Sequence, residues 1–374
     1  MLPVPRRSTR WIVLAAATAA LSMVIWGCSK NPVGTDVELS RVDPTTTFTT
    51  LNPRVQAVMR LQDRHTADLM SIQGVVGTAT GLDDHGNIVV QVLTEYPLGA
   101  RIPRMFDGVG VVEVVTGKIT AYKGPGGGVS HTAIQSPPIQ LGTSGGPAGD
   151  IANGFCCGGT LGSLVHIGST QYILSNSHVF AGDVVPGGNG TVSAIGDDIT
   201  QPGLIDVGCQ ASQAQVVADL SSLSTLYPPG STPNVDCAIA QVRAGMVQTD
   251  GAILEVGTLS ASTVGASINQ AVKKSGRTTG LSRSKVSGLN GTVNVGYSDE
   301  CAGGSFTKTF TGQIFITNRG SKFLNSGDSG SLMVEDVTTN PRAVGLLYAG
   351  SSTTAVANPI NDVLSHLGAQ MVGN

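Results

Sequence analysis

The sequence predicts a mainly β protein that ends in a helix, with a small α+β unit in front of the β body. Three observations predict this class. The 374 residues include 50 glycines and only 13% charged residues, against typical values of roughly 7% and about 25%. From Gly159 onward, short runs of Val, Ile, Leu and Thr alternate with clusters of Gly, Asn, Asp and Pro. No long amphipathic helix interrupts these runs before the C-terminus, which favours an all-β barrel or sandwich over an α/β fold.

Residues 1–28 are predicted to be a lipoprotein-type signal peptide. Three arginines within residues 6–10 precede an uncharged run at 11–27, the layout of a secretory signal. The tetrapeptide "IWGC" resembles a bacterial lipobox, with Trp26 in place of the usual small residue, and this implies lipidation of Cys28. We therefore expect an extracytoplasmic protein of the bacterial cell envelope, held at the membrane through a lipid anchor at Cys28. An uncleaved signal anchor is the alternative.

The next two segments are predicted to be a tether and a small domain. Residues 29–53 are rich in Thr, Pro and Asn and have no apolar period, which indicates a flexible tether. Residues 54–122 contain a helical pattern at 54–72, a hairpin signal around "DDHGN" and a third apolar run at 109–115. We predict a small α+β domain here. Whether it inhibits the β body, helps it fold or positions a substrate stays open.

Residues 123–152 are predicted to be a linker, because Gly, Pro and Ser dominate their composition. The β body then occupies residues 153–374. Its C-terminal helix is predicted to have Asn358 as N-cap and Pro359 at the first helical position, followed by apolar residues at spacings of three, four and seven.

Charge and cysteine content limit the classes of partner and cofactor that we expect. The net charge is −3, and the chain has no block of basic residues, so no nucleic-acid partner is expected. Apart from Cys28, an odd number of cysteines remains, which leaves at least one unpaired thiol in an oxidising compartment. None of them has a second Cys or His pair at zinc-ligand spacing, so we interpret them as structural, with pairing open, and expect no metal or cofactor. They are Cys156, Cys157, Cys209, Cys237 and Cys301.

The run "FLNSGDSGSLMV" at 323–334 has two interpretations. One is a surface turn, for which Gly, Asp and Ser are ordinary residues. The other is a nucleophile, Ser329, on a glycine-made corner whose N–H groups face a developing oxyanion. A serine nucleophile needs a base, and the base needs an orienting carboxylate. His178 in "YILSNSHVFAG" and Asp236 in "NVDCAIAQV" supply these types, in the order His, Asp, Ser.

Together, "SNSHVFAG", "VDCAIA", "GRTTGLSRSKVSG" and "SGDSGSL" resemble the chymotrypsin-like serine peptidases. The likeness is closer to a bacterial trypsin-like branch that carries "GVVGT…GLDDHGN" upstream, and it spans roughly residue 74 to the C-terminus. It implies a chymotrypsin-like double β-barrel, a protein or peptide substrate, and a Ser-His-Asp triad that acts through an acyl-enzyme. His178 would be the general base, Asp236 its orienter and Ser329 the nucleophile, with the N–H groups of Gly327 and Ser329 as the oxyanion hole.

This chain departs from the common pattern at two places. Ser331 follows Gly330 where a glycine is commoner, and no cysteine follows His178. Both departures concern the geometry around the pocket more than the triad.

The resemblance also implies an ion pair beside the nucleophile. Asp328 needs a cation to hold the oxyanion loop, and in many animal relatives a freed N-terminal amine supplies it. Arg277 resembles the arginine that takes over this task in relatives of the α-lytic type. We therefore predict an Arg277–Asp328 ion pair, with an ordinary turn arginine as the alternative.

The segment 346–359, "LLYAGSSTTAVANP", matches in position the family strand that pairs with an extended peptide and lines the primary pocket. The match implies substrate binding by Ala349, Gly350 and Ser351. The segment carries no acid, which argues against cleavage after Lys or Arg. Phe323 and Leu324 nearby favour an apolar or small side chain instead.

Two other function classes compete with a peptidase. An esterase is suggested by "GTSGG" at 142–146, which matches Gly-x-Ser-x-Gly around Ser144, with His366 as the later histidine. That motif needs a strand before it and a helix after it, whereas here it falls in the predicted linker. The other alternative is a non-catalytic surface lipoprotein that binds peptides on a peptidase fold.

Overall fold

The computed structural model describes residues 46–121, 129–152, 154–182, 193–228, 230, 233–299 and 304–374. The signal peptide, Cys28 and most of the predicted tether lie outside these residues. Residues 41–374 cluster as one compact unit. No helix among the described residues is long and apolar enough to cross a membrane.

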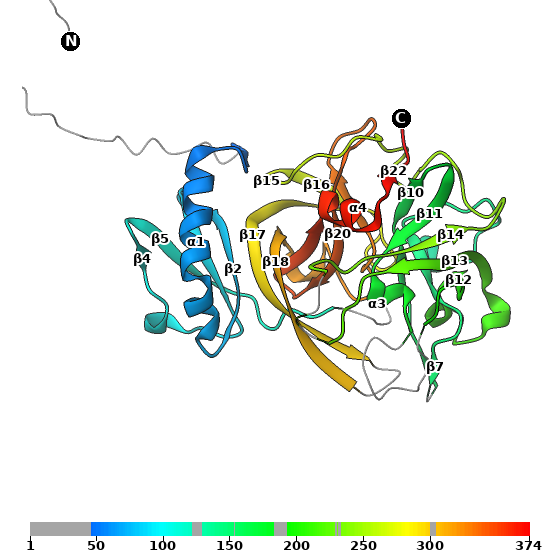
Figure 1. Cartoon of the computed structure of the whole chain (residues 1–374), viewed down its shortest axis with the longest axis horizontal. Coiled ribbons are helices and arrows are strands. Elements are labelled where there is room, and N and C mark those ends of the chain that lie inside the picture. The colour runs from blue at the N-terminus through cyan, green and yellow to red at the C-terminus, as the bar shows by residue number, and fades with distance from the viewer. Residues whose placement is uncertain are drawn as a thin grey trace, which may run out of the picture. The chain divides into compact units, whose positions relative to one another are not determined.

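The first large sheet has eight strands, of which all but β22 lie between residues 143 and 242 (Figure 1). Its core contains Leu164, Ile173 and Val217. In spatial order the strands are β22 (Gln370–Met371), β10 (Ser163–Ile167), β11 (Thr170–Ser175), β14 (Ala238–Val242), β13 (Gln215–Leu223), β12 (Asp198–Gln201), β6 (Thr143–Pro147) and β9 (Gly159–Leu161).

Strand β6 shows that the linker predicted for 123–152 is too long. β6 pairs with both β12 and β9, although its sequence is "TSGGP". The reason for the glycine is close packing, since a Cβ at Gly145 would lie 2.8 Å from the Thr200 carbonyl oxygen and closer still to the Leu161 side chain. Glycine here therefore belongs to a buried strand and not to a connection.

The second large sheet has ten strands, of which the first six form a closed ring. β16 pairs with β19 at one side and with β17 at the other, so the six strands from β16 to β17 make a barrel. In spatial order the strands are β16 (Ala271–Lys274), β19 (Leu332–Glu335), β20 (Ala343–Gly350), β21 (Thr354–Pro359), β18 (Gly304–Thr317), β17 (Ser282–Asp299), β2 (Val75–Leu82), β3 (Ile88–Thr94), β5 (Val109–Val115) and β4 (Met105–Phe106).

The predicted α+β unit joins this barrel directly. Its elements are confirmed, with helix α1 at Pro53–Ser71 and the hairpin β2–β3. Asn52 caps α1 by accepting from the N–H groups of Arg54 and Val55. However, β2 hydrogen-bonds to β17, so one sheet runs from the barrel into this unit. Val55 of α1 is fully buried in the core that the barrel strands share.

The C-terminal helix α4 covers Ile360–Leu367 and buries Ile360, Val363 and Leu367. A mainly β chain that ends in a helix is therefore confirmed. The predicted cap is wrong, since Pro359 is the N-cap residue and Asn358 belongs to β21. The remaining elements are α2 (Val129–Thr132), α3 (Ser177–Phe180), the pairs β1 (Phe48–Thr49) with β15 (Ser267–Ile268) and β7 (Ile151–Ala152) with β8 (Phe155–Cys156), and the 3-10 turns Gly99–Arg101, Leu204–Asp206, Ala211–Gln213 and Arg319–Ser321.

The cysteine pairing that the sequence left open is partly defined. Cys156 and Cys209 form a disulfide. Cys157 is buried, and Cys237 is a fully buried thiol directly after Asp236. Cys301 lies outside the described residues.

Candidate active site

His178 and Asp236 meet at the ends of two neighbouring strands of the first sheet. His178 lies in the short helix α3, directly after β11, and Asp236 lies just before β14, the strand that pairs with β11. His178 Nδ1 is 2.5 Å from Asp236 Oδ2, and the His178 N–H donates to Oδ1 at 3.3 Å. Both side chains are almost fully buried. A buried carboxylate on Nδ1 orients the imidazole and leaves Nε2 for proton transfer.

Two buried asparagines fix the backbone of Asp236, and sequence reasoning missed this role for both. The Asn176 side chain donates to the Asp236 carbonyl at 2.7 Å. The side chain of Asn358 donates to the same carbonyl at 3.2 Å and accepts from the Asp236 N–H at 3.2 Å. Sequence patterns gave a partial indication of these two residues. Asn176 belongs to the motif "SNSH", and Asn358 precedes the proline at the start of the C-terminal helix.

Ser329 sits on a turn that only glycines permit. Gly327 and Gly330 both have φ of +91°, a backbone conformation that disfavours residues with a Cβ. A Cβ at Gly327 would lie 2.5 Å from Arg277 Nη1. The N–H groups of Asp328 and Gly330 donate to Asn325 and Leu347, whereas those of Gly327 and Ser329 have no acceptor among the described residues. These two donors are therefore available for a ligand oxygen.

Ser329 lies next to the helix that carries His178. A Cβ at Gly159 would lie 2.7 Å from the Val179 side chain and 3.0 Å from the Ser329 carbonyl oxygen, so both approach one point of β9. In this conformation Ser329 Oγ donates to the Tyr348 carbonyl at 3.2 Å. His178 Nε2 is buried and has no hydrogen-bond partner in the described part of the chain. The Ser–His hydrogen bond of a triad is thus not formed here.

The predicted Arg277–Asp328 ion pair is wrong. Asp328 Oδ1 is 3.0 Å from Lys274 Nζ, at the end of β16, and both side chains are fully buried. Asp328 also accepts from the N–H groups of Thr278 and Thr279 and from the Thr279 hydroxyl. Burial lowers the pKa of Lys274, and the charge of Asp328 opposes this shift.

Arg277 instead makes a bidentate ion pair with Asp206, from Nε at 2.7 Å and Nη2 at 2.5 Å. The planar guanidinium matches a carboxylate with two parallel hydrogen bonds, which explains this choice of partner. The Ser144 hydroxyl donates to the same carboxylate at 2.5 Å. Ser144 is therefore a structural residue within strand β6 and not a nucleophile on a strand-to-helix turn.

The segment predicted to bind substrate is buried, and part of it is already paired. Ala349 and Ser351 have exposed fractions of 0% and 4%. Gly350 belongs to β20, in which every residue is buried. Gly350 exchanges two main-chain hydrogen bonds with Thr120, at 3.0 and 2.8 Å. Phe323 and Leu324 are buried in the barrel core.

We call residues Ile119–Ala121 the strap. On its other side, the strap pairs with β17: the Ala121 N–H donates to the Gly296 carbonyl, and the Gly296 N–H donates to the Ile119 carbonyl, both at 3.0 Å. The strap thus lies as an extended strand between Gly350 of β20 and Gly296 of β17, and it buries Ile119 and Ala121.

An aromatic cluster surrounds Asp236 from the side of β17 and β18. The Tyr297 hydroxyl donates to Asp236 Oδ2 at 3.0 Å, and Phe310 lies against Tyr348 with ring centroids 5.1 Å apart. Burial raises the pKa of Tyr297 and of Tyr348 well above the ordinary value, and the charge of Asp236 adds to both shifts. Burial lowers the pKa of Lys308, whose Nζ is 5.6 Å from the Phe310 ring centre, and Asp236 opposes that shift.

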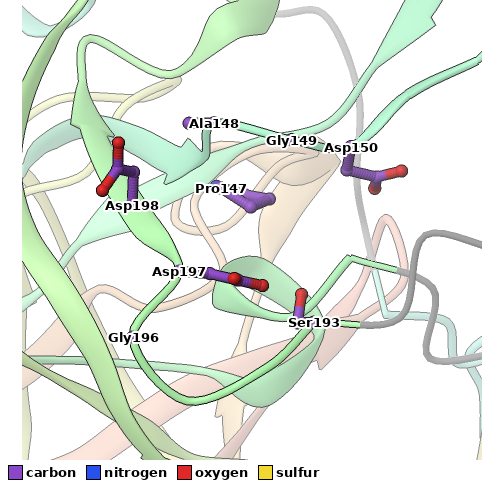
Figure 2. A pocket seen from close by; sticks show the side chains of 8 residues that line it. All are labelled: Pro147, Ala148, Gly149, Asp150, Ser193, Gly196, Asp197 and Asp198. Atoms are coloured by element: carbon purple, nitrogen blue, oxygen red, sulfur yellow. The ribbon is translucent and has the colours of Figure 1, made fainter.

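A separate cavity of about 460 Å³ lies on the first sheet (Figure 2). Its carboxylates have protein partners, because Asp197 accepts from the Ala194 N–H and Asp198 pairs with Arg243. Among the described residues, no group of three His, Cys, Asp or Glu side chains is arranged to hold a metal ion. The cavity is lined by Pro147, Ala148, Gly149, Asp150, Ser193, Gly196, Asp197 and Asp198.

Comparisons with known proteins give likenesses of structure only. No protein-family model and no curated protein matches the chain. A glutamic acid-specific serine protease that uses a histidine triad in substrate binding matches with 19% identity and a TM-score of 0.41, over 62% of this chain and 100% of its own. Protease A of Thermobifida fusca matches with 19% identity and a TM-score of 0.41, over 63% and 99%. Cellulomonas bogoriensis chymotrypsin matches with 18% identity and a TM-score of 0.38, over 63% and 99%.

Proposed function

We propose that this protein is a serine endopeptidase of the trypsin/chymotrypsin-like type, which hydrolyses peptide bonds through Ser329, His178 and Asp236. The observation that carries the proposal is the buried His178–Asp236 pair at 2.5 Å beside a glycine turn that presents Ser329. His178 would take the proton of Ser329 as the hydroxyl attacks the substrate carbonyl, and Asp236 would stabilise the imidazolium. The free N–H groups of Gly327 and Ser329 would hold the tetrahedral oxyanion before the acyl-enzyme forms.

Catalysis requires one local change from the conformation described above. The Ser329 hydroxyl must leave the Tyr348 carbonyl and turn toward His178 Nε2. Catalytic hydrogen bonds are often loose without substrate and tighten when it binds. His178 Nε2 has no other hydrogen-bond partner among the described residues, so it can accept this proton.

The same proposal includes latency imposed by the N-terminal segment. An extended peptide binds a sheet edge through main-chain hydrogen bonds, and the strap already uses those of Gly350. The strap would therefore compete with a substrate for the segment Ala349–Ser351. Because it is part of the same chain, its effective concentration is high, and an external peptide must displace it.

Labelling with a fluorophosphonate probe tests the enzyme class. The purified wild-type protein is compared with the variants Ser329→Ala, His178→Ala and Ser144→Ala. We expect no labelling of Ser329→Ala and a loss of about 10²–10⁴-fold in rate for His178→Ala, the usual contribution of a general base. Ser144→Ala is the matched serine control and should label like wild type. Labelling that depends on Ser144 would instead establish the esterase alternative.

A wild-type protein that does not label is tested again after strap pairing is weakened by Thr120→Pro. Labelling only in that variant would support latency. If the wild type, Thr120→Pro and the double variant with Ala121→Pro all fail to label, the result would reject the peptidase and leave the non-catalytic peptide-binding protein.

We further propose that the protein is anchored in the bacterial cell envelope through a lipid on Cys28. The support is the sequence pattern of residues 1–28. Mass spectrometry of the mature N-terminal peptide tests it, because a lipidated Cys28 adds the mass of its acyl chains. An unmodified N-terminus at another residue would contradict the anchor.

A further inference from the structure

Asp236 has a hydrogen-bond partner that the proposed triad does not include. Its Oδ2 atom faces His178 Nδ1 at 2.5 Å and also accepts from the Tyr297 hydroxyl at 3.0 Å. Tyr297 comes from β17, in the second sheet, whereas His178 and Asp236 come from the first. The Tyr297 ring lies edge-on to the imidazole, with ring centroids 5.8 Å apart. One side chain therefore contacts both members of the pair.

The surroundings of Tyr297 hold its hydroxyl in place. The ring stacks on Phe306 at 4.9 Å with an interplanar angle of 10°, and it lies 6.4 Å from Phe310. Its exposed fraction is 3%. Packing restricts the phenol ring of Tyr297, and burial keeps its hydroxyl protonated. The hydroxyl can therefore donate to the Asp236 carboxylate without a further loss of conformational freedom in each catalytic cycle.

We propose that Tyr297 is a positioning residue for catalysis, which holds Asp236 through its hydroxyl and thereby sets the orientation and basicity of His178. The inference rests on the proposed peptidase function. A neutral donor on Oδ2 withdraws part of the carboxylate charge from the imidazole. Loss of that donor leaves Asp236 more negative toward His178, and the imidazolium becomes easier to form.

The test is Tyr297→Phe, which removes one oxygen and keeps the ring. We expect kcat to fall about tenfold or more, because hydrogen bonds to charged groups contribute more than neutral ones. KM should change little, since the ring that fills this space is retained. The acidic limb of the pH profile of kcat/KM should move to higher pH, because it reports the deprotonation of His178.

Tyr227→Phe is the matched control. Tyr227 belongs to the same aromatic cluster through Phe306, at 5.4 Å, but its side chain is 43% exposed. We expect kcat and the pH limb of this variant to equal those of wild type. A purely structural effect on the cluster would lower activity in both variants and would leave the limb in place.

The pH profile also depends on the other titratable groups whose charge interacts with Asp236. Burial also raises the pKa of Cys237, and the charge of Asp236 adds to it. Tyrosine and thiol groups with raised pKa values stay neutral across the acidic limb, so their charge does not change there. The facing groups are Tyr297, Tyr348, Lys308 and Cys237.

NMR of the full chain with labelled histidine keeps the inference separate from the peptidase proposal. The resonance lost in His178→Ala identifies the imidazole, and its pKa is measured without any turnover. An upward shift in Tyr297→Phe supports the positioning role even if fluorophosphonate labelling fails. An unchanged pKa and an unchanged kcat would overturn the role of Tyr297 and leave the triad intact.

Discussion

Weakening the strap should release activity toward peptides by a calculable factor. Four main-chain hydrogen bonds join the strap to Gly350 and Gly296. Proline at position 120 has no N–H group and removes the bond to the Gly350 carbonyl. One such bond contributes about 1 kcal/mol, so the population with a free Gly350 edge should rise about fivefold. Adding Ala121→Pro removes a second donor, for a total of about 2 kcal/mol and about thirtyfold.

The assay is kcat/KM for an extended peptide substrate with a small or apolar residue before the cleaved bond. The folded fraction of each sample, measured by circular dichroism, corrects for any loss of native protein. Thr120→Val keeps the main-chain pairing and is the control, with activity expected near wild type. If the single and double proline variants show the same kcat/KM as wild type, the strap does not occupy the place of the substrate.

The other predictions concern stability. Lys274→Met should lower the free energy of unfolding by about 3–5 kcal/mol, because it leaves the Asp328 carboxylate buried without a cation; in chemical denaturation, adding Asp328→Asn should recover only part of the loss, since Asn has a single acceptor oxygen for the donors that face Asp328, and no recovery would contradict the ion pair. Asn358→Ala should cost about 1–3 kcal/mol in the same measurement, since the Asp236 N–H loses its acceptor and the Asp236 carbonyl loses one of its two side-chain donors. The hydrogen bond from Arg342 is the main cause that lowers the pKa of Glu335 below 4.5; its stabilisation is therefore present above pH 4.5 and lost as pH falls through the lowered value. Thermal unfolding of Glu335→Gln should then differ from wild type at pH 7 and converge with it in acid, and an equal difference at both would refute this.

Local patterns in the sequence predicted two elements of the N-terminal unit well. The helix expected at 54–72 and the strand expected at 109–115 are α1 and β5. The same reasoning failed at β6, because close packing selects glycine there and erases the apolar pattern. Composition alone does not distinguish a strand of this kind from a loop.

The sequence suggested the residue types of the candidate site and the pairing of His178 with Asp236, but not its other contacts. Motif order suggested His178, Asp236 and Ser329, but it selected Arg277 as the cation for Asp328, when Lys274, three residues earlier, makes that contact. Which cation reaches the carboxylate depends on where β16 ends, which no motif encodes. The strap had little side-chain signal, since its pairing with β17 and β20 is made by the backbone and only Ile119 and Ala121 are buried.

The continuous sheet from β17 into β2 has a consequence for any cut between the strap and the barrel. Cleavage would break the chain but not the ladder, because β2 stays paired with β17 along four registered residue pairs and α1 stays packed on the barrel core. Separation would expose a long strand edge to water. A nicked molecule should thus run as two bands under denaturing conditions and elute as one species in native buffer. The N-terminal fragment would remain bound to the barrel as a separate chain.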